Sequence, residues 1–334
     1  ECAHEYPDES REALLRVLDY YLHSAYAADR RLFPGRDPLD LAPPQPGVVP
    51  DSPRDEAEAL DWIEREWAAL LAAAAVAADE GLNRHAWQIP WSLATFQARR
   101  GRWHEWRDTH RRALTVATAA NDAAGRIYAL RGLGRVESRI GDIASAERHL
   151  AQAVELAAET GDRLGLARTL TTRAWMFELT GRPQDALAAA TRALEIFEEL
   201  EHPNGRAEAY NTVGWYLALN KDYVQAQAMC ARSLELLRAL GHRFGEAGTL
   251  DSIGYIAHCR GDYDTAAEAY QRAIELFADV GDRTYEAGTI VRLGDTLAAA
   301  GDTVAARGEW MRGLRILEEL DHPDVEDVRA RLAE

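Results

Sequence analysis

This chain of 334 residues contains a single lysine, Lys221, and only three cysteines, Cys2, Cys230 and Cys259. The wide spacing of the cysteines excludes a disulfide framework and a zinc motif, and it favours a reducing compartment. No apolar run reaches the ~18 residues that a membrane-spanning helix requires, and the start of the chain has no signal peptide. We therefore expect a cytoplasmic protein with no membrane partner. Because the chain begins with Glu1, we also expect a fragment of a longer protein.

Positive charge is in deficit as well, since 38 arginines and lysines face 55 acidic residues, giving a net charge of −17. A chain this acidic has no general field that would hold nucleic acid. One basic stretch, "ARRGRWHEWRDTHRR" (98–112), admits three interpretations: a nucleic-acid strand stacked on tryptophans, packed tryptophans beside a solvated arginine face, or docking to an acidic domain of the same full-length protein. The packed-tryptophan interpretation fits the acidic chain best, so we predict no direct nucleic-acid binding.

Motifs for catalysis are also missing. The lysine lies in "LNKDY", which excludes a phosphate-binding loop. In "GLGRVE" (132–137) Glu137 stands where a dinucleotide loop has its last glycine, so Gly132 is expected to pack helices. In "HEWRDTH" (104–110) Asp108 replaces the second histidine of a zinc protease, so His104 and Asp108 should lie on a solvated helix face. The sequence therefore predicts no enzyme, no metal and no cofactor.

What the chain has in abundance is a pattern with a period of forty residues. Small residues recur in one column: Ala94, Gly134, Ala174, Gly214, Gly254 and Gly294. Two further columns hold Ala146, Ala186, Ala226, Ala266 and Ala306, and then Ala113, Ala153, Ala193, Ser233, Ala273 and Gly313. Trp106 interrupts the first of these, so the first hairpin should be irregular. Two helices pack with axes ~8–10 Å apart only where side chains are small, so these columns predict paired helices.

A turn signal separates the two amphipathic stretches of each repeat. Gly-Asp stands at 141–142, 161–162, 261–262, 281–282 and 301–302. Glycine can adopt the left-handed conformation that ends a helix, and aspartate can cap the next one. We therefore predict one helix per Gly-Asp interval, in an all-α fold: a right-handed solenoid of about six stacked hairpins.

These columns resemble those of the tetratricopeptide repeat family, with the family's turn aromatic at Tyr223 and Tyr263 and its late aromatic at Tyr270 and Trp310. The unit here is forty residues rather than 34, so longer helices are expected. The resemblance covers roughly residues 83–322.

The flanking segments add a second resemblance. The helix "LLRVLDYYLHSAYAADRRLFP", a proline-rich linker, "AEALDWIEREWAALLAAAAVAADEG" and "ARRGRWHEW" are similar to the C-terminal region of the Streptomyces antibiotic regulatory protein (AfsR/SARP) family. The resemblance implies a region that follows DNA-binding and nucleotide-switch domains, although this chain contains neither. The expected organisation is an N-terminal helix as the tail of a preceding domain (1–33), a linker (34–54), a capping helix (55–82), six repeats (83–322) and a C-terminal capping helix (323–334).

In tetratricopeptide stacks the first helix of each hairpin lines a concave groove. The resemblance therefore implies that groove residues lie near the small column, three positions before it and one after it. The candidate binding residues at these positions and one turn away are Arg131, Arg135, Arg168, Trp175, Glu208, Asn211, Trp215, Asp251, Tyr255 and His258. Trp175, Trp215 and Tyr255 should form an aromatic row, and aromatic and arginine side chains are frequent interface anchors. The alternative is that these rings only fill the inner wall.

The leading hypothesis is a non-catalytic interaction and sensor module of a transcriptional regulator. It would bind a protein, a peptide, or the nucleotide-switch (NB-ARC) and DNA-binding domains of its own full-length chain. The alternative is a receptor domain for a small molecule or a signal peptide.

Overall fold

The computed structural model describes residues 7–320, 322 and 324–333, and every regular element among them is a helix. The predicted all-α fold is confirmed. Cys2 and the outermost residues of the predicted segments 1–33 and 323–334 lie outside the described residues. Contacts between residues divide the chain into two compact units, Glu1–Thr180 and Gly181–Glu334, which are described separately.

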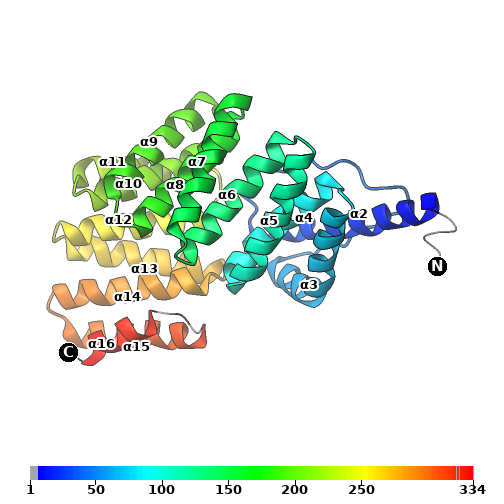
Figure 1. Ribbon diagram of the computed structural model, residues 1–334. Coiled ribbons are helices and arrows are strands. Elements are labelled where there is room, and N and C mark those ends of the chain that lie inside the picture. Colours follow the sequence, from blue (N-terminus) through cyan, green and yellow to red (C-terminus); the bar gives the residue numbers. More distant parts are fainter. Residues whose placement is uncertain (1–6, 321, 323, 334) are drawn as a thin grey trace. The chain divides into compact units, whose positions relative to one another are not determined.

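The first unit contains seven described helices: α2 (Pro7–Leu32), α3 (Glu56–Asp79), α4 (Asn83–Arg100), α5 (Trp103–Ala119), α6 (Ala123–Arg139), α7 (Ile143–Thr160) and α8 (Arg163–Leu179). The second unit contains eight: α9 (Pro183–Glu199), α10 (Pro203–Leu219), α11 (Tyr223–Ala239), α12 (Arg243–Cys259), α13 (Tyr263–Asp279), α14 (Arg283–Ala299), α15 (Thr303–Glu319) and α16 (Val325–Ala333). In the second unit α12, α13, α14 and α15 lie side by side in chain order, each against the next (Figure 1).

The Gly-Asp signals end and begin helices as predicted. Gly161 ends α7 with a φ of 71°, and the side chain of Asp162 accepts a hydrogen bond from the Gly165 backbone N–H at 2.8 Å. The same arrangement recurs with Asp142, Asp262, Asp282 and Asp302 as caps. Lys221 occupies an equivalent turn position with a φ of 66°, which is unfavourable for a residue with a Cβ atom.

The small column marks the closest approach of paired helices. A Cβ atom on Gly134 would lie 2.4 Å from Cγ of Leu150, and one on Gly254 would lie 2.7 Å from Cε1 of Tyr270. Both glycines are buried, as the packing argument requires. Trp106 is 2% exposed and packs with Ala94. Because α4 and α5 still have 18 and 17 residues, the first hairpin keeps regular helix lengths despite this tryptophan.

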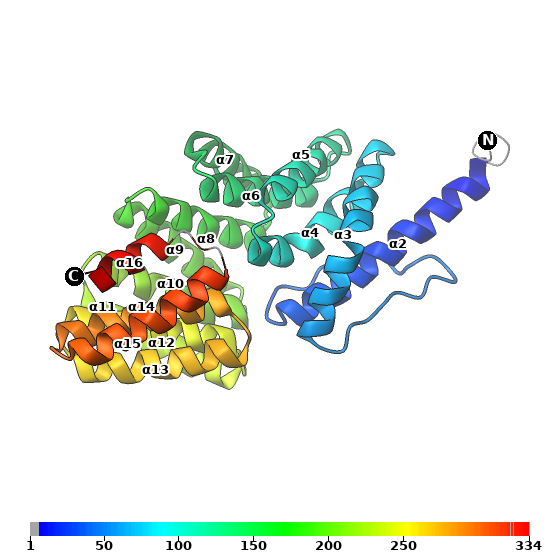
Figure 2. The same ribbon diagram turned by 90° about the horizontal axis from the view of Figure 1, so that it is seen from below.

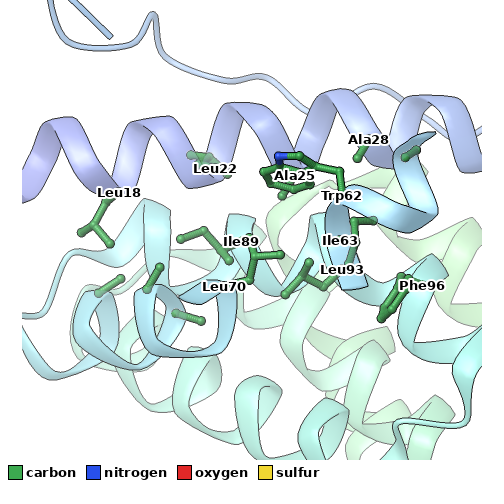
Figure 3. Close-up of a cluster of buried hydrophobic side chains, with 14 of the residues drawn as sticks. Leu18, Leu22, Ala25, Ala28, Trp62, Ile63, Leu70, Ile89, Leu93 and Phe96 are labelled. Carbon is green, nitrogen blue, oxygen red and sulfur yellow. The ribbon is translucent and has the colours of Figure 1, made fainter. Parts of the chain in front are cut away.

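The N-terminal helix contributes to the core of the first unit. Leu18, Leu22, Ala25 and Ala28 on α2 face side chains of α3 and α4, among them Ile63 and Ile89 (Figure 3). The linker after α2 runs back along that helix and returns to α3 (Figure 2). Two backbone N–H groups hold it there: Gln45 donates to Asp19 at 2.8 Å and Asp51 to Ser24 at 2.9 Å. The proline-rich segment is therefore an ordered part of this unit.

None of the helices in the described part of the chain is long and apolar enough to cross a membrane. The C-terminal helix α16 packs against α15, with Val328 1% exposed in a shared apolar cluster. The proposal that α3 and α16 act as caps of the stack rests on these positions in the chain and on the amphipathic pattern of both segments.

Candidate functional site

In the first unit the linker covers the predicted groove-facing positions of α4. The guanidinium of Arg36 lies 3.4 Å from the ring centroid of Trp91. It donates to the Trp91 carbonyl at 3.0 Å and to the Asp29 carboxylate at 2.9 Å. The Thr95 hydroxyl donates to the same carboxylate at 2.6 Å. Burial raises the pKa of Asp29, while the charge of Arg36 and the hydrogen bond from Thr95 oppose that rise.

The next linker residue, Asp37, reaches α8. Its two carboxylate oxygens accept from Nε and Nη2 of Arg168 at 2.6 and 2.7 Å, a bidentate pair in which both side chains are under 20% exposed. Arg131 of α6 lies close enough to feel both charges. Burial lowers the pKa of Arg131 to about 10; Tyr128 and Asp37 oppose this decrease, and Arg36 and Arg168 add to it. The structure thus brings the predicted residues Arg131 and Arg168 together, around a carboxylate that sequence reasoning missed.

Two more arginines continue along the same face of α6. The Arg135 guanidinium lies 5.7 Å from the ring centroid of Trp106, and that of Arg139 lies 5.5 Å from the ring centroid of Trp103. Both arginines are exposed. The two tryptophan rings stack on each other with centroids 6.1 Å apart. The tryptophans of the basic stretch 98–112 are therefore packed, and they support arginines of the neighbouring helix.

In the second unit Trp215 and Tyr255 form an aromatic pair on α10 and α12. Their ring centroids are 5.0 Å apart at an interplanar angle of 49°, and both side chains are half-buried. Asn211 and Glu208 lie one and two turns before Trp215 on α10 and are also half-buried. Trp175, the third member of the predicted row, is half-buried on α8 of the first unit.

Asp251 and His258 of α12 both bond to α14. The Asp251 carboxylate accepts from Nη2 of Arg292 at 2.9 Å and from the Thr289 hydroxyl at 2.8 Å, and the residue is 8% exposed. Nδ1 of His258 lies 2.9 Å from the hydroxyl of Thr296. These two predicted site residues thus join successive first helices, and the part they offer to a ligand is smaller than for Trp215.

A further groove-facing carboxylate, Asp295 of α14, is covered by the C-terminal helix. It accepts from Nε of Arg331 and from Nε1 of Trp310, both at 2.9 Å. This contact was missed because the terminal sequence indicates a short amphipathic helix without indicating which residue it meets.

The motifs tested for chemistry hold structural positions. His110 is fully buried: its Nδ1 lies 2.9 Å from the Trp106 carbonyl and its Nε2 lies 3.3 Å from the Tyr128 hydroxyl. Burial lowers the pKa of His110 to about 3. A Cβ atom on Gly132 would lie 2.1 Å from this imidazole, so Gly132 serves helix packing, as expected. His104 is exposed, and within the described residues no group of three or more histidine, cysteine or acidic side chains is arranged to hold a metal.

Stacked hairpins of this kind can now be compared with known families. The family model of the tetratricopeptide repeat matches residues 88–159, 141–199 and 205–279. The chain belongs to the tetratricopeptide repeat family. Repeats of this family form protein-interaction modules, and the predicted resemblance is confirmed.

The sequence of this tetratricopeptide repeat protein is also similar to a curated regulator. It is 31% identical over 199 residues to regulatory protein AfsR of Streptomyces griseus, which corresponds to 58% of this chain and 20% of AfsR. The chain therefore spans about a fifth of the length of that relative.

Solved structures with the same fold include two signalling proteins. A Rap protein complexed with competence and sporulation factor is 17% identical with a TM-score of 0.58, over 83% of this chain and 78% of that one. A signal transduction ATPase with a tetratricopeptide repeat sensor, from Pyrococcus horikoshii, is 14% identical with a TM-score of 0.56, over 83% of this chain and 48% of that one. At these identities the likeness establishes the repeat solenoid fold.

Proposed function

We propose that this chain is the interaction and sensor region of a transcriptional regulator similar to AfsR, and that it binds a protein or peptide on the inner wall of its repeats. It acts by binding and not by catalysis. The observation that carries this proposal is the linker: an extended segment of polypeptide already lies over groove-facing positions of α4 and pairs with Arg168. A surface that binds its own extended chain through side-chain contacts has the chemistry to bind another.

The likeness to AfsR supports the regulatory part of the proposal, since it extends over 58% of this chain. The preferred partner is the nucleotide-switch domain of the same full-length protein. Titration calorimetry of this chain against that purified domain, loaded with ADP or with ATP, tests this directly. Binding that differs between the two nucleotides is expected, and no binding in either state would refute internal regulation.

The aromatic residues define the variants for this experiment. Trp215→Ala and Trp175→Ala should each weaken partner binding while leaving helix content unchanged, because a buried aromatic anchor contributes ~2 kcal/mol or more to an interface. Val224→Ala is the control, since Val224 is an apolar side chain of α11 that is 76% exposed. Unchanged binding in both tryptophan variants would show that the inner wall is not the site.

A second candidate function is a receptor for a signal peptide. It is favoured by the fold shared with a Rap protein solved in complex with a competence and sporulation factor. Thermal-shift screening against pools of short peptides and metabolites separates the two: stabilisation by a pool member, together with no affinity for the nucleotide-switch domain, would favour the receptor.

A further inference from the structure

The arginines of α6 form a regular stripe. Arg131, Arg135 and Arg139 follow one another at intervals of four residues, and each guanidinium lies 5.5–5.7 Å from the centroid of an aromatic ring: Tyr128, Trp106 and Trp103 respectively. Residues four apart on a helix share a face and are separated by about 6 Å along the axis. The rings behind the stripe hold three guanidinium groups in a row, and each group can still donate hydrogen bonds outward.

Positive charge exceeds negative charge where this stripe meets the linker. Arg36, Arg131 and Arg168 converge there on two carboxylates, Asp29 and Asp37, and Asp29 is fully buried beneath Arg36. The exposed Arg135 and Arg139 extend the basic surface along α6. In a chain whose net charge is −17, this is a local reversal of sign. A basic surface backed by tryptophans is complementary to an acidic segment.

The linker shows how such a segment is recognised. Asp37 belongs to a stretch without helix or strand and presents its carboxylate to both Arg168 nitrogens, the geometry in which arginine binds carboxylates most strongly. In an extended peptide, side chains on one face recur every second residue, at about 6.6–6.8 Å. That interval is close to the spacing of about 6 Å between successive arginines of the stripe.

We propose that the face of α6 formed by Arg131, Arg135 and Arg139, together with Arg168, binds an extended acidic segment of a partner protein that carries carboxylates at alternate residues. Asp37 of the linker is the internal occupant of the Arg131–Arg168 end of this site and competes with the partner for it. This inference rests on the proposed interaction function and names the class of partner and the regulating element.

The probe is a fluorescein-labelled peptide, Gly-Glu-Ser-Glu-Ser-Glu-Gly, titrated into the whole chain by fluorescence anisotropy. Its controls are the glutamine version and an isomer with the three glutamates adjacent. We expect the alternating peptide to bind most tightly, and its affinity to fall as the salt concentration rises from about 0.1 M to 0.5 M. No binding of the alternating peptide, or equal binding of both acidic isomers, would overturn the proposed register.

Variants of the chain then separate the stripe from general charge. Arg139→Glu should weaken binding about tenfold, whereas Arg111→Glu, the same charge change at an exposed position of α5, should change it little. Asp37→Asn should tighten binding several-fold, because Arg168 is then no longer neutralised, and circular dichroism verifies that the variant is folded. Equal effects of the two charge reversals would refute the stripe, and unchanged affinity in Asp37→Asn would refute the competition. A natural partner that still binds Arg139→Glu but not Trp215→Ala would leave the proposed function intact and refute this site alone.

Discussion

Substituting Gly214 by alanine tests the packing of the second unit quantitatively. The new Cβ atom would lie 2.5 Å from Sγ of Cys230, 3.1 Å from the carbonyl oxygen of Ala226 and 3.2 Å from the backbone nitrogen of Cys230. Favourable non-bonded separations are ~3.5–4.0 Å. A rotation of Cys230 can relieve the first contact, but two of the three atoms belong to the backbone of α11. The helices α10 and α11 must therefore move apart by several tenths of an ångström.

Two opposing effects set the magnitude. Overpacking of a tight core costs about 1–3 kcal/mol, whereas replacing a helical glycine by alanine gains about 1 kcal/mol of helix propensity. Gly214→Ala should therefore lower the free energy of unfolding by about 1–2 kcal/mol. The matched control is Gly248→Ala in α12, where the added Cβ atom would have no neighbouring atom within 4 Å. This second variant should gain up to about 1 kcal/mol.

Urea unfolding followed by circular dichroism measures both variants. The two chemically identical substitutions should shift the midpoint in opposite directions and differ by about 2–3 kcal/mol, the sum of the two expected effects. Adding Cys230→Ala to Gly214→Ala removes the nearest clash, so the double variant should be more stable than the sum of the single effects predicts. Equal shifts for Gly214→Ala and Gly248→Ala would refute the argument that the small column exists for helix approach.

Three other substitutions test the turns and one buried group. Lys221→Gly should raise the free energy of unfolding by about 1 kcal/mol in urea, because glycine tolerates the φ of 66°; Lys221→Ala, which retains the strain, should not. Asp162→Ala should cost about 1 kcal/mol through the lost cap on Gly165, and an unchanged midpoint would contradict that role. Because burial lowers the pKa of His110 to about 3, the unfolded state, with a pKa near 6.5, binds the proton first. Its contribution to stability is present above pH ~6.5 and is lost as pH falls toward 3, so His110→Gln should reduce the loss of stability between pH 7 and 5 by about 2 kcal/mol; parallel pH curves for wild type and variant would refute this.

The periodic features of the fold were predictable because each depends on neighbours in sequence. A cap such as Asp162 acts three residues away, and the small residue Gly254 meets Tyr270 sixteen positions later, in the same hairpin. The bond from Asp251 to Arg292 spans 41 residues, so a comparison of equivalent columns in successive repeats would have found it. The pair of Arg168 with Asp37 spans 131 residues, and no period connects the two. A proline-rich composition predicts the absence of a helix, but it does not indicate where an extended segment will lie.

The preference for arginine over lysine follows from the same contacts. The ammonium of lysine is a compact point charge, whereas a guanidinium is planar, stacks on aromatic rings and pairs with a carboxylate through two parallel bonds. Arg36 uses the first property on Trp91, and Arg168 uses the second on Asp37. A lysine at either position would keep the charge and lose the geometry. An inner wall that must hold a flexible segment in one register, and release it to a competitor of matching shape, therefore requires arginine, and the near absence of lysine is consistent with that requirement.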